Sequence, residues 1–205
     1  MLNLREVERQ TDDLRTGLSP HYPLLFNIIW GMDAKAVFEF GCGGSSIVIC
    51  EALKYTGGQV IGCYTGGAFD KIKDRIPLNI GMYHDLDSHK TLSIAENINI
   101  TFDVVLHDGS HTYSIVKEDI KRIVKMMKQF SLLLVHDTEH EHCGGDMRRA
   151  LLEGLEGIQY SMTTLPYGFG LTIVRIEGNE HIGRVEEGRN KASKFIHIPR
   201  SIQWN

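Results

Sequence analysis

Residues 37–46 of the chain read VFEFGCGGSS, an apolar run that leads directly into a glycine-rich turn. The apolar residues from Ala36 to Phe40 predict a buried strand. From Ser46 to Leu53 the apolar residues recur at helical spacing, which predicts a helix. A strand, a tight turn and a helix in this order aim backbone N–H groups and the positive end of the helix dipole at a ligand. The sequence therefore predicts a site for a polar or anionic group at this turn.

The alternation of strand and helix continues along the chain. Further strands are predicted at 59–64, 80–83, 102–106 and 131–135, separated by segments with helical spacing. The clearest helix carries one apolar stripe, formed by Val116, Ile120, Ile123, Val124 and Met127. Segments 158–163 and 170–176 predict an antiparallel pair. We therefore expect an α/β fold of the Rossmann-like, doubly wound type, with a mostly parallel sheet and an antiparallel C-terminal hairpin at its edge.

The length of the chain, 205 residues, indicates one domain. A globule of this size buries roughly 70% of the surface that its unfolded chain exposes, so it needs no disulfide or structural metal. Two helical segments, 4–14 and 22–30, predict an N-terminal helical cap over residues 1–33. We expect the α/β core to span 34–176 and a C-terminal tail to span 177–205.

Charge and composition narrow the class of protein. The net charge of −4 argues against a broad phosphate-binding surface, and the basic run from Lys117 to Lys128 is interpreted as the solvated face of a helix. The four cysteines form no CxxC pair and are expected to be free thiols. The charged first fifteen residues lead us to expect no secretory signal, and no apolar run is long enough to span a membrane. We expect a cytoplasmic protein with a small-molecule substrate, no nucleic-acid or membrane partner, and a homodimer as the default assembly.

The glycine turn differs from the dinucleotide-binding fingerprint. Its pattern is Gly41-x-Gly43-Gly44-x-Ser46, so serine stands where the third glycine of GxGxxG belongs. The acid expected after the second strand is also missing. Both differences disfavour an NAD-linked oxidoreductase.

The segment 37–46 resembles motif I of class I S-adenosylmethionine-dependent methyltransferases, whose hallmark is E/D-x-G-x-G. The resemblance implies S-adenosylmethionine as the cofactor. By position it places these residues beside the cofactor: Glu39, Gly41, Cys42, Gly43 and Ser45.

The second strand departs from that family pattern. Family members usually end this strand with an acid that binds both ribose hydroxyls, whereas this chain ends it at Tyr64 and has no carboxylate until Asp70. Either Tyr64 or Thr65 performs a weaker version of the task, or the cofactor site has changed or been lost. By the same resemblance, Asp85 lies near the adenine.

Two aspartates follow the next two strands of the predicted sheet. Asp108 comes after the strand at 102–106, and Asp137 after the strand at 131–135. Ligands of open α/β sheets bind outside the carboxyl ends of the strands, so both carboxylates should reach one crevice beside the glycine turn. There they suit a hard divalent cation; alternatively, each only caps the helix that follows.

These two segments resemble the D-G-x-H-x-Y and H-D signatures of macrocin-type sugar O-methyltransferases and cephalosporin-hydroxylase-like proteins. The resemblance implies magnesium held by Asp108 and Asp137, with Asp108 also near the cofactor and His111 as the general base. The metal-dependent members carry a further acidic ligand directly before the last aspartate. This chain has His136 there, which we include as a candidate ligand although imidazole favours other metals than magnesium.

The leading hypothesis is an S-adenosylmethionine-dependent O-methyltransferase that acts on a hydroxyl of a small molecule, with a sugar or glycoside as the suggested acceptor. One alternative is a non-catalytic protein that retains the methyltransferase fold for binding or as a scaffold. Another is a metal-dependent hydrolase, in which Asp108 shares an ion with residues of the stretch at 136–143. The candidate ligands in that stretch are His136, His140, His142 and Cys143.

Overall fold

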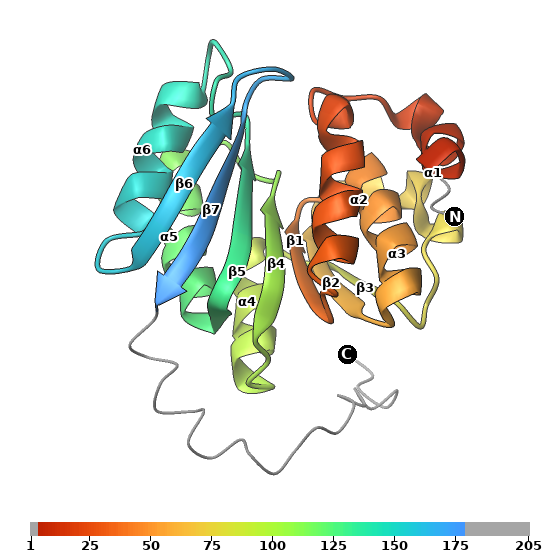
Figure 1. Ribbon diagram of the computed structural model, residues 1–205, viewed down its shortest axis with the longest axis horizontal. Helices are drawn as coiled ribbons and strands as arrows, with labels where there is room; N and C mark the ends of the chain where they lie inside the picture. Colours follow the sequence, from red (N-terminus) through yellow and green to blue (C-terminus); the bar gives the residue numbers. More distant parts are fainter. Residues whose placement is uncertain (1–3, 179–205) are drawn as a thin grey trace.

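The computed structural model describes residues 4–178 as a three-layer α/β/α arrangement (Figure 1). Its seven-stranded sheet has the order β3-β2-β1-β4-β5-β7-β6. The strands are β1 (Ala36–Phe40), β2 (Gln59–Tyr64), β3 (Gly81–Asp85), β4 (Phe102–His107), β5 (Met127–His136), β6 (Gln159–Leu165) and β7 (Leu171–Gly178). The helices are α1 (Leu4–Thr11), α2 (Tyr22–Gly31), α3 (Gly44–Thr56), α4 (Ser88–Asn97), α5 (Tyr113–Ile123) and α6 (Gly144–Gly154).

Strands β1 to β5 are parallel to one another, and β7 pairs antiparallel with both β5 and β6. The structure thus confirms the predicted mostly parallel sheet with an antiparallel hairpin at its C-terminal edge. Every residue of β1 is buried, because helices cover both faces of the sheet.

The two faces of the sheet have separate apolar cores. Alternate strand residues such as Phe38 and Val105 pack with α4, α5 and α6, whereas Val37 and Val104 pack with α2 and α3. Figure 1 shows α2 and α3 lying side by side over one half of the sheet. Helices α2 and α3 therefore cover part of the sheet, and α3 begins four residues after the end of β1.

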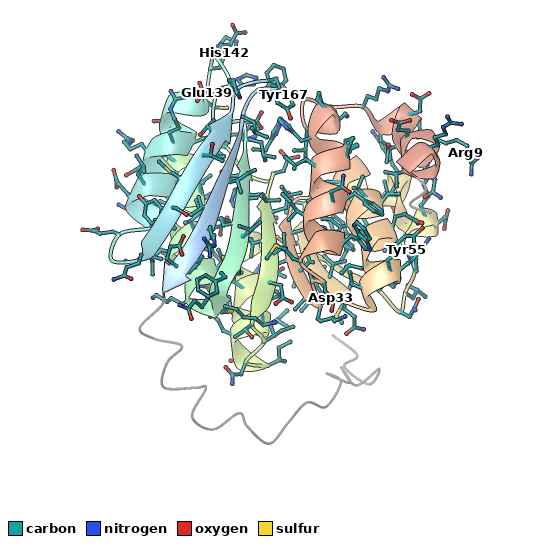
Figure 2. All side chains as sticks on the ribbon, viewed as in Figure 1. Arg9, Asp33, Tyr55, Glu139, His142 and Tyr167 are labelled. Atoms are coloured by element: carbon teal, nitrogen blue, oxygen red, sulfur yellow. The ribbon has the colours of Figure 1, made fainter. Side chains whose placement is uncertain are left out.

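The carboxyl ends of β1, β4 and β5 meet at one edge of the sheet, which we call the rim. Phe40 is the register partner of His107, and His107 is the partner of Val135. Figure 2 shows Tyr167 at this end of the molecule, whereas Asp33, just before β1, lies at the opposite end. The sheet order reverses at β1, and the rim beside such a point is where ligands bind in open α/β sheets.

Both helices predicted near the N-terminus are present, with short 3-10 turns beside them. The segment at 4–14 is α1 followed by a 3-10 turn over Asp12–Leu14, and Ser19–His21 forms another 3-10 turn before α2. Helix α3 ends where Gly57 adopts a left-handed conformation, with φ of 69°.

The prediction was wrong about Met127, which we placed on the apolar stripe of a helix. Helix α5 ends at Ile123, a 3-10 turn covers Val124–Met126, and Met127 begins β5 as the register partner of Phe102. The side chain of Met127 is fully buried in the core in either case, so its apolar character does not distinguish a helix from a strand.

Two further expectations can be compared with residues 4–178. All four cysteines are free thiols, as predicted. No helix in this part of the chain combines the length and apolar character needed to cross a membrane. Most of the tail predicted at 177–205 lies outside the described residues, which end in β7.

Candidate active site

The glycine turn at the end of β1 packs directly on the neighbouring strands. The N–H of Gly41 donates to the carbonyl of Cys63 at 2.9 Å, and the N–H of Asp108 donates to the carbonyl of Phe40 at 3.0 Å. Gly41 has a φ of +92°, and a Cβ at this position would overlap the carbonyl oxygen of Asp108. Only glycine allows this close approach, which joins the turn to the residue predicted to share its site.

Glu39 is fully buried beneath the turn, and three hydroxyl groups donate to its carboxylate. The donors are Ser45 at 2.5 Å, Ser46 at 2.7 Å and Tyr83 at 2.6 Å. Burial raises the pKa of Glu39 to about 7, against the lowering effect of these hydrogen bonds. The Ser46 hydroxyl also accepts from the N–H of Gly43 at 3.1 Å. Glu39 and Ser45 therefore support the turn from within.

Cys42 and Gly43 form the half-exposed side of the turn, before the first residue of α3. A Cβ on Gly43 would meet no atom within 4 Å, so this side is open. Burial raises the pKa of the Cys42 thiol to about 12, which keeps it neutral. The open side of the turn thus offers backbone groups and a neutral thiol to a ligand.

Aromatic rings occupy the region beyond β2, where the resemblance leads one to expect an acid. The ring of Phe69 stacks between Tyr64, at 4.9 Å, and Tyr83, at 5.4 Å. Asp85, an exposed residue at the end of β3, is the register partner of Tyr64. A carboxylate is therefore present beside the end of β2, on the adjacent strand.

His136 lies between the two aspartates at the rim. Its Nδ1 atom is 3.0 Å from Asp108 Oδ1 and 3.2 Å from Asp137 Oδ2, and its Nε2 atom is 2.7 Å from the carbonyl oxygen of Gly168. Burial lowers the pKa of His136, but the two carboxylates outweigh that effect and raise it to about 10. The ring of His136 therefore contacts both aspartates and the Gly168 carbonyl at once.

Asp137 adopts an uncommon backbone conformation with φ of +59°. Its Oδ2 atom is 2.7 Å from Nε2 of His111, whose side chain is half exposed. Burial tends to raise the pKa of Asp137, but contacts with His136 and His111 hold it below its usual value. The result is an ionised carboxylate that orients an accessible imidazole.

Three potential metal-ligating groups converge here: Asp108, His111 and Asp137, with ligand atoms within 4.8 Å of one another. His136, predicted as a ligand, is not in this group. Its Nδ1 atom lies 3.0 and 3.2 Å from the two carboxylates, and its Nε2 atom lies 2.7 Å from the Gly168 carbonyl. No such group containing His140, His142 or Cys143 occurs within residues 4–178. This arrangement gives no support to the ligand set of the hydrolase alternative.

The N-terminal cap contacts both the glycine turn and the β6–β7 hairpin. The Tyr22 hydroxyl lies so close to Gly44 that a Cβ there would overlap it. The buried ring of His21 stacks on Tyr167 at 4.4 Å and hydrogen-bonds the Tyr167 carbonyl through Nε2 at 2.9 Å. The segment before α2 therefore links the turn to the hairpin beside the rim.

Sequence reasoning missed three contributors to this site: Ser46, Tyr83 and Gly168. Ser46 had a detectable signal, since a serine three residues after a helix N-cap suggests a capping interaction. Tyr83 in β3 reaches Glu39 because Gly62 in β2 leaves space for its ring. This contact depends on how the strands pair, which the sequence does not show. Gly168 contributes a backbone carbonyl, which no side-chain pattern reveals.

The sequence of the chain matches one known kind of domain. Residues 38–138 match the sequence model of a methyltransferase domain. The match includes the glycine turn, Asp108, His111 and Asp137. No curated protein sequence matches the chain.

Solved structures share the fold at low sequence identity. A Staphylococcus aureus protein provisionally described as a caffeoyl-CoA O-methyltransferase is 14% identical, with a TM-score of 0.65 over 84% of this chain and 90% of that one. The Podospora anserina methyltransferase PaMTH1, solved with S-adenosylhomocysteine, is 13% identical, with a TM-score of 0.63 over 87% and 98%. The mycinamycin-pathway methyltransferase MycE, solved with magnesium, S-adenosylhomocysteine and mycinamycin VI, is 17% identical, with a TM-score of 0.55 over 80% and 50%.

The domain match and the sheet order together define the class of protein. They confirm the prediction of a class I, S-adenosylmethionine-dependent methyltransferase with a Rossmann-like fold.

Proposed function

We propose that this chain transfers the methyl group of S-adenosylmethionine to a hydroxyl of a small molecule, with a sugar or glycoside as the acceptor class. The observation that carries the proposal is the pairing of His111 with Asp137 at 2.7 Å on the rim that also holds the glycine turn. An accessible imidazole oriented by a carboxylate is a general base suited to a hydroxyl proton.

The open side of the turn is the proposed seat of the cofactor. The methionine and ribose parts would lie along Gly41, Cys42 and Gly43, with Asp108 at the adjacent strand end. Asp85 and Tyr64 would meet the nucleoside, because they are register partners at the ends of β3 and β2. Asp85 would supply the carboxylate that the end of β2 lacks.

The proposed reaction is a direct displacement at the methyl carbon. His111 takes the proton of the acceptor hydroxyl while the oxygen bonds to the methyl carbon. The carbon–sulfur bond breaks, its electron pair stays on sulfur, and S-adenosylhomocysteine is released. Asp137 stabilises the imidazolium that forms on His111. Most of the rate enhancement would come from holding oxygen, carbon and sulfur in line.

The donor set at the rim does not suit magnesium. Magnesium prefers oxygen ligands in octahedral geometry, whereas the third donor beside Asp108 and Asp137 is the imidazole of His111. In addition, the Nδ1 atom of His136 lies 3.0 and 3.2 Å from the two carboxylates, on the side that a cation would approach. No step of the proposed reaction therefore runs through magnesium.

The surroundings of the rim support a ring-shaped acceptor. Tyr167 and Phe169, at the tip of the β6–β7 hairpin, each expose about half of their surface, and Phe169 packs against His140 at 4.7 Å. Exposed aromatic rings offer flat apolar faces that suit the faces of sugars and other rings. MycE, which was solved with mycinamycin VI, shares the fold.

The proposal makes two measurements decisive. Calorimetric titration with S-adenosylhomocysteine should give a saturable heat, and a methyl-transfer assay over a panel of sugars and glycosides should give a methyl ether from S-adenosylmethionine. Binding heat with S-adenosylhomocysteine but no methyl transfer to any hydroxyl would favour a binding protein. No binding heat at millimolar S-adenosylhomocysteine would favour a scaffold. A rise in melting temperature with NAD alone would favour the oxidoreductase.

Assembly and location are proposed separately. We expect a homodimer, which sedimentation velocity measures directly, and a cytoplasmic location, which fractionation of the source cells measures. We expect the acceptor to be a small molecule. A nucleic-acid acceptor is disfavoured because the net charge of −4 would repel its phosphates.

A further inference from the structure

We propose that Phe169 selects the acceptor: its ring forms the surface on which the apolar face of a sugar ring lies while a hydroxyl of that sugar reaches His111. This inference rests on the proposed methyl-transfer function and deepens it, because it names the residue that distinguishes a ring-shaped acceptor from other alcohols. It concerns acceptor binding alone, since Phe169 belongs neither to the proposed cofactor site nor to the pair that takes the proton.

Phe169 lies at the rim, where a short series of contacts links it to the proposed base. The carbonyl of its neighbour Gly168 is 2.7 Å from Nε2 of His136, and Nδ1 of that ring is 3.2 Å from Oδ2 of Asp137. The same oxygen of Asp137 is 2.7 Å from Nε2 of His111. A molecule that lies against the hairpin tip is therefore near the base.

Contacts with two other segments hold the ring of Phe169 in place. A Cβ on Gly17 would lie 2.1 Å from Cδ2 of Phe169, so the ring packs directly on the backbone of the cap. His140 packs against the ring at 4.7 Å, and the N–H of Glu139 donates to the Phe169 carbonyl at 2.8 Å. Figure 2 shows Glu139 and Tyr167 together at this end of the molecule. The ring is thus fixed between the cap and the loop after β5, while about half of its surface stays exposed.

The backbone at the hairpin tip adopts a conformation that phenylalanine rarely takes. Phe169 has a φ of +64°, and its neighbours Gly168 and Gly170 have φ of +58° and +85°. A bulky side chain is strained at such a value, whereas glycine or asparagine tolerates it more readily. The half-exposed ring also gains little from apolar burial. Contact with an acceptor gives this ring a role that stability does not, in keeping with the clustering of strained residues at ligand sites.

A flat, half-exposed aromatic ring suits one face of a sugar. The C–H groups of a pyranose gather on its faces, and its hydroxyls lie around the edge. Stacking of one face on Phe169 buries the C–H groups and leaves a hydroxyl at the edge free to reach His111. An open-chain polyol carries similar hydroxyls but has no such face. Contact with Phe169 therefore favours ring acceptors over open-chain ones.

Phe130 provides a matched control at the other end of the sheet. It has the same φ of +64° and nearly the same exposure, 51% against 50% for Phe169. The guanidinium of Arg175 lies 4.7 Å from its ring centroid, near the start of β5, whereas the rim is at the end of that strand. Strain alone therefore does not mark a binding site, and the position beside His111 sets Phe169 apart. Phe130→Asn repeats the chemical change of Phe169→Asn away from the acceptor.

The test measures methyl transfer to a panel of methyl glycosides and to sorbitol, an open-chain polyol. The wild-type chain should show a higher kcat/KM for at least one methyl glycoside than for sorbitol. Phe169→Asn should raise the KM for that glycoside about tenfold, the loss of one aromatic contact, with kcat and S-adenosylhomocysteine affinity nearly unchanged. Phe169→Leu keeps apolar bulk without a flat ring and should also lose the preference over sorbitol. Phe130→Asn should match the wild type.

A double-variant comparison ties the effect to the position of the ring. Gly17→Ala places a methyl group where the Phe169 ring lies and should displace the ring, so it should raise the same KM. In the Phe169→Asn background, Gly17→Ala should add nothing further, because the ring is already absent. Additive increases in KM, or an unchanged KM in Phe169→Asn, would overturn the inference.

Saturation-transfer NMR with the methyl glycosides needs no turnover, so it stands apart from the proposed function. Irradiation of aromatic protons in the wild-type chain should saturate the sugar ring protons, and Phe169→Asn should lose most of this signal. Equal transfer in both proteins, or none to any glycoside in the wild type, would overturn the role of Phe169. Absence of S-adenosylhomocysteine binding would instead remove the methyltransferase proposal. If Phe169→Asn does not unfold cooperatively, Phe169→Leu decides both measurements.

Discussion

The Nε2 atom of His111 lies 2.7 Å from the Oδ2 atom of Asp137, although the two residues follow different strands, β4 and β5. Parallel pairing of these strands brings their carboxyl ends together, and the left-handed backbone of Asp137 turns its carboxylate toward the base. The pairing leaves the Nδ1 side of His111 for a substrate.

The first prediction concerns this pair. His111→Ala should reduce methyl transfer by about 10²- to 10⁴-fold, the usual contribution of a positioned base, and should leave S-adenosylhomocysteine affinity nearly unchanged. Asp137→Asn should lower turnover as well, because His111 loses the carboxylate that orients it. Stopped assays and calorimetry measure both effects. Wild-type turnover in His111→Ala would remove the proposed base.

The second prediction separates folding from cofactor binding at the glycine turn. Gly41→Ala should lower the free energy of unfolding by about 1–3 kcal/mol, because alanine is strained at φ of +92° and its methyl group would overlap the Asp108 carbonyl. Gly43→Ala meets open space and should unfold like the wild type. It should nevertheless bind S-adenosylhomocysteine more weakly, since its methyl group faces the proposed cofactor. Equal affinity in Gly43→Ala and wild type would place the cofactor elsewhere.

The third prediction follows from the pKa of Glu39, which rises from 4.5 to about 7 on burial. Between these values the folded chain keeps a proton that the unfolded chain has lost, so this group makes stability fall as pH rises from about 4.5 to 7. The loss is at most about 3 kcal/mol. Glu39→Gln cannot ionise and should lose less stability across this range.

Urea unfolding at pH 5 and pH 8 measures the difference between Glu39→Gln and the wild type. Glu118→Gln, on the exposed side of α5, is the matched control and should follow the wild type. Parallel pH dependence in all three proteins would mean that Glu39 is ionised throughout.

The fourth prediction concerns the nucleoside end of the cofactor. Asp85→Asn should weaken S-adenosylhomocysteine binding by about tenfold, the cost of one charged hydrogen-bond acceptor. Asp70→Asn removes the other nearby carboxylate, which pairs with Lys73 at the surface, and should leave the affinity unchanged. Calorimetry on both variants measures the effect. The reverse ranking would assign the ribose contact to the segment after β2.

Most of the fold could be predicted from the sequence, because its signals are local. The alternation of apolar strands with helical stripes sets a parallel α/β sheet, and the glycines after Phe40 mark the turn. The position of Asp108 and Asp137 directly after their strands was enough to bring both carboxylates to one rim, since parallel strands share their carboxyl ends. Met127 was misassigned because its apolar side chain fits a helical stripe and a buried strand equally well.

The chemistry of the site depends on contacts between distant segments, and these only the tertiary structure decided. Glu39 reads as a cofactor residue in the motif, yet hydroxyls from α3 and β3 satisfy its buried carboxylate. The motif predicts His136 as a metal ligand beside Asp137, yet its Nε2 atom lies 2.7 Å from the Gly168 carbonyl and its Nδ1 atom lies between the two aspartates. The sequence determines which groups reach the rim, because strand ends are local features. Their hydrogen-bond partners follow from packing, and the partners decide what each group can do.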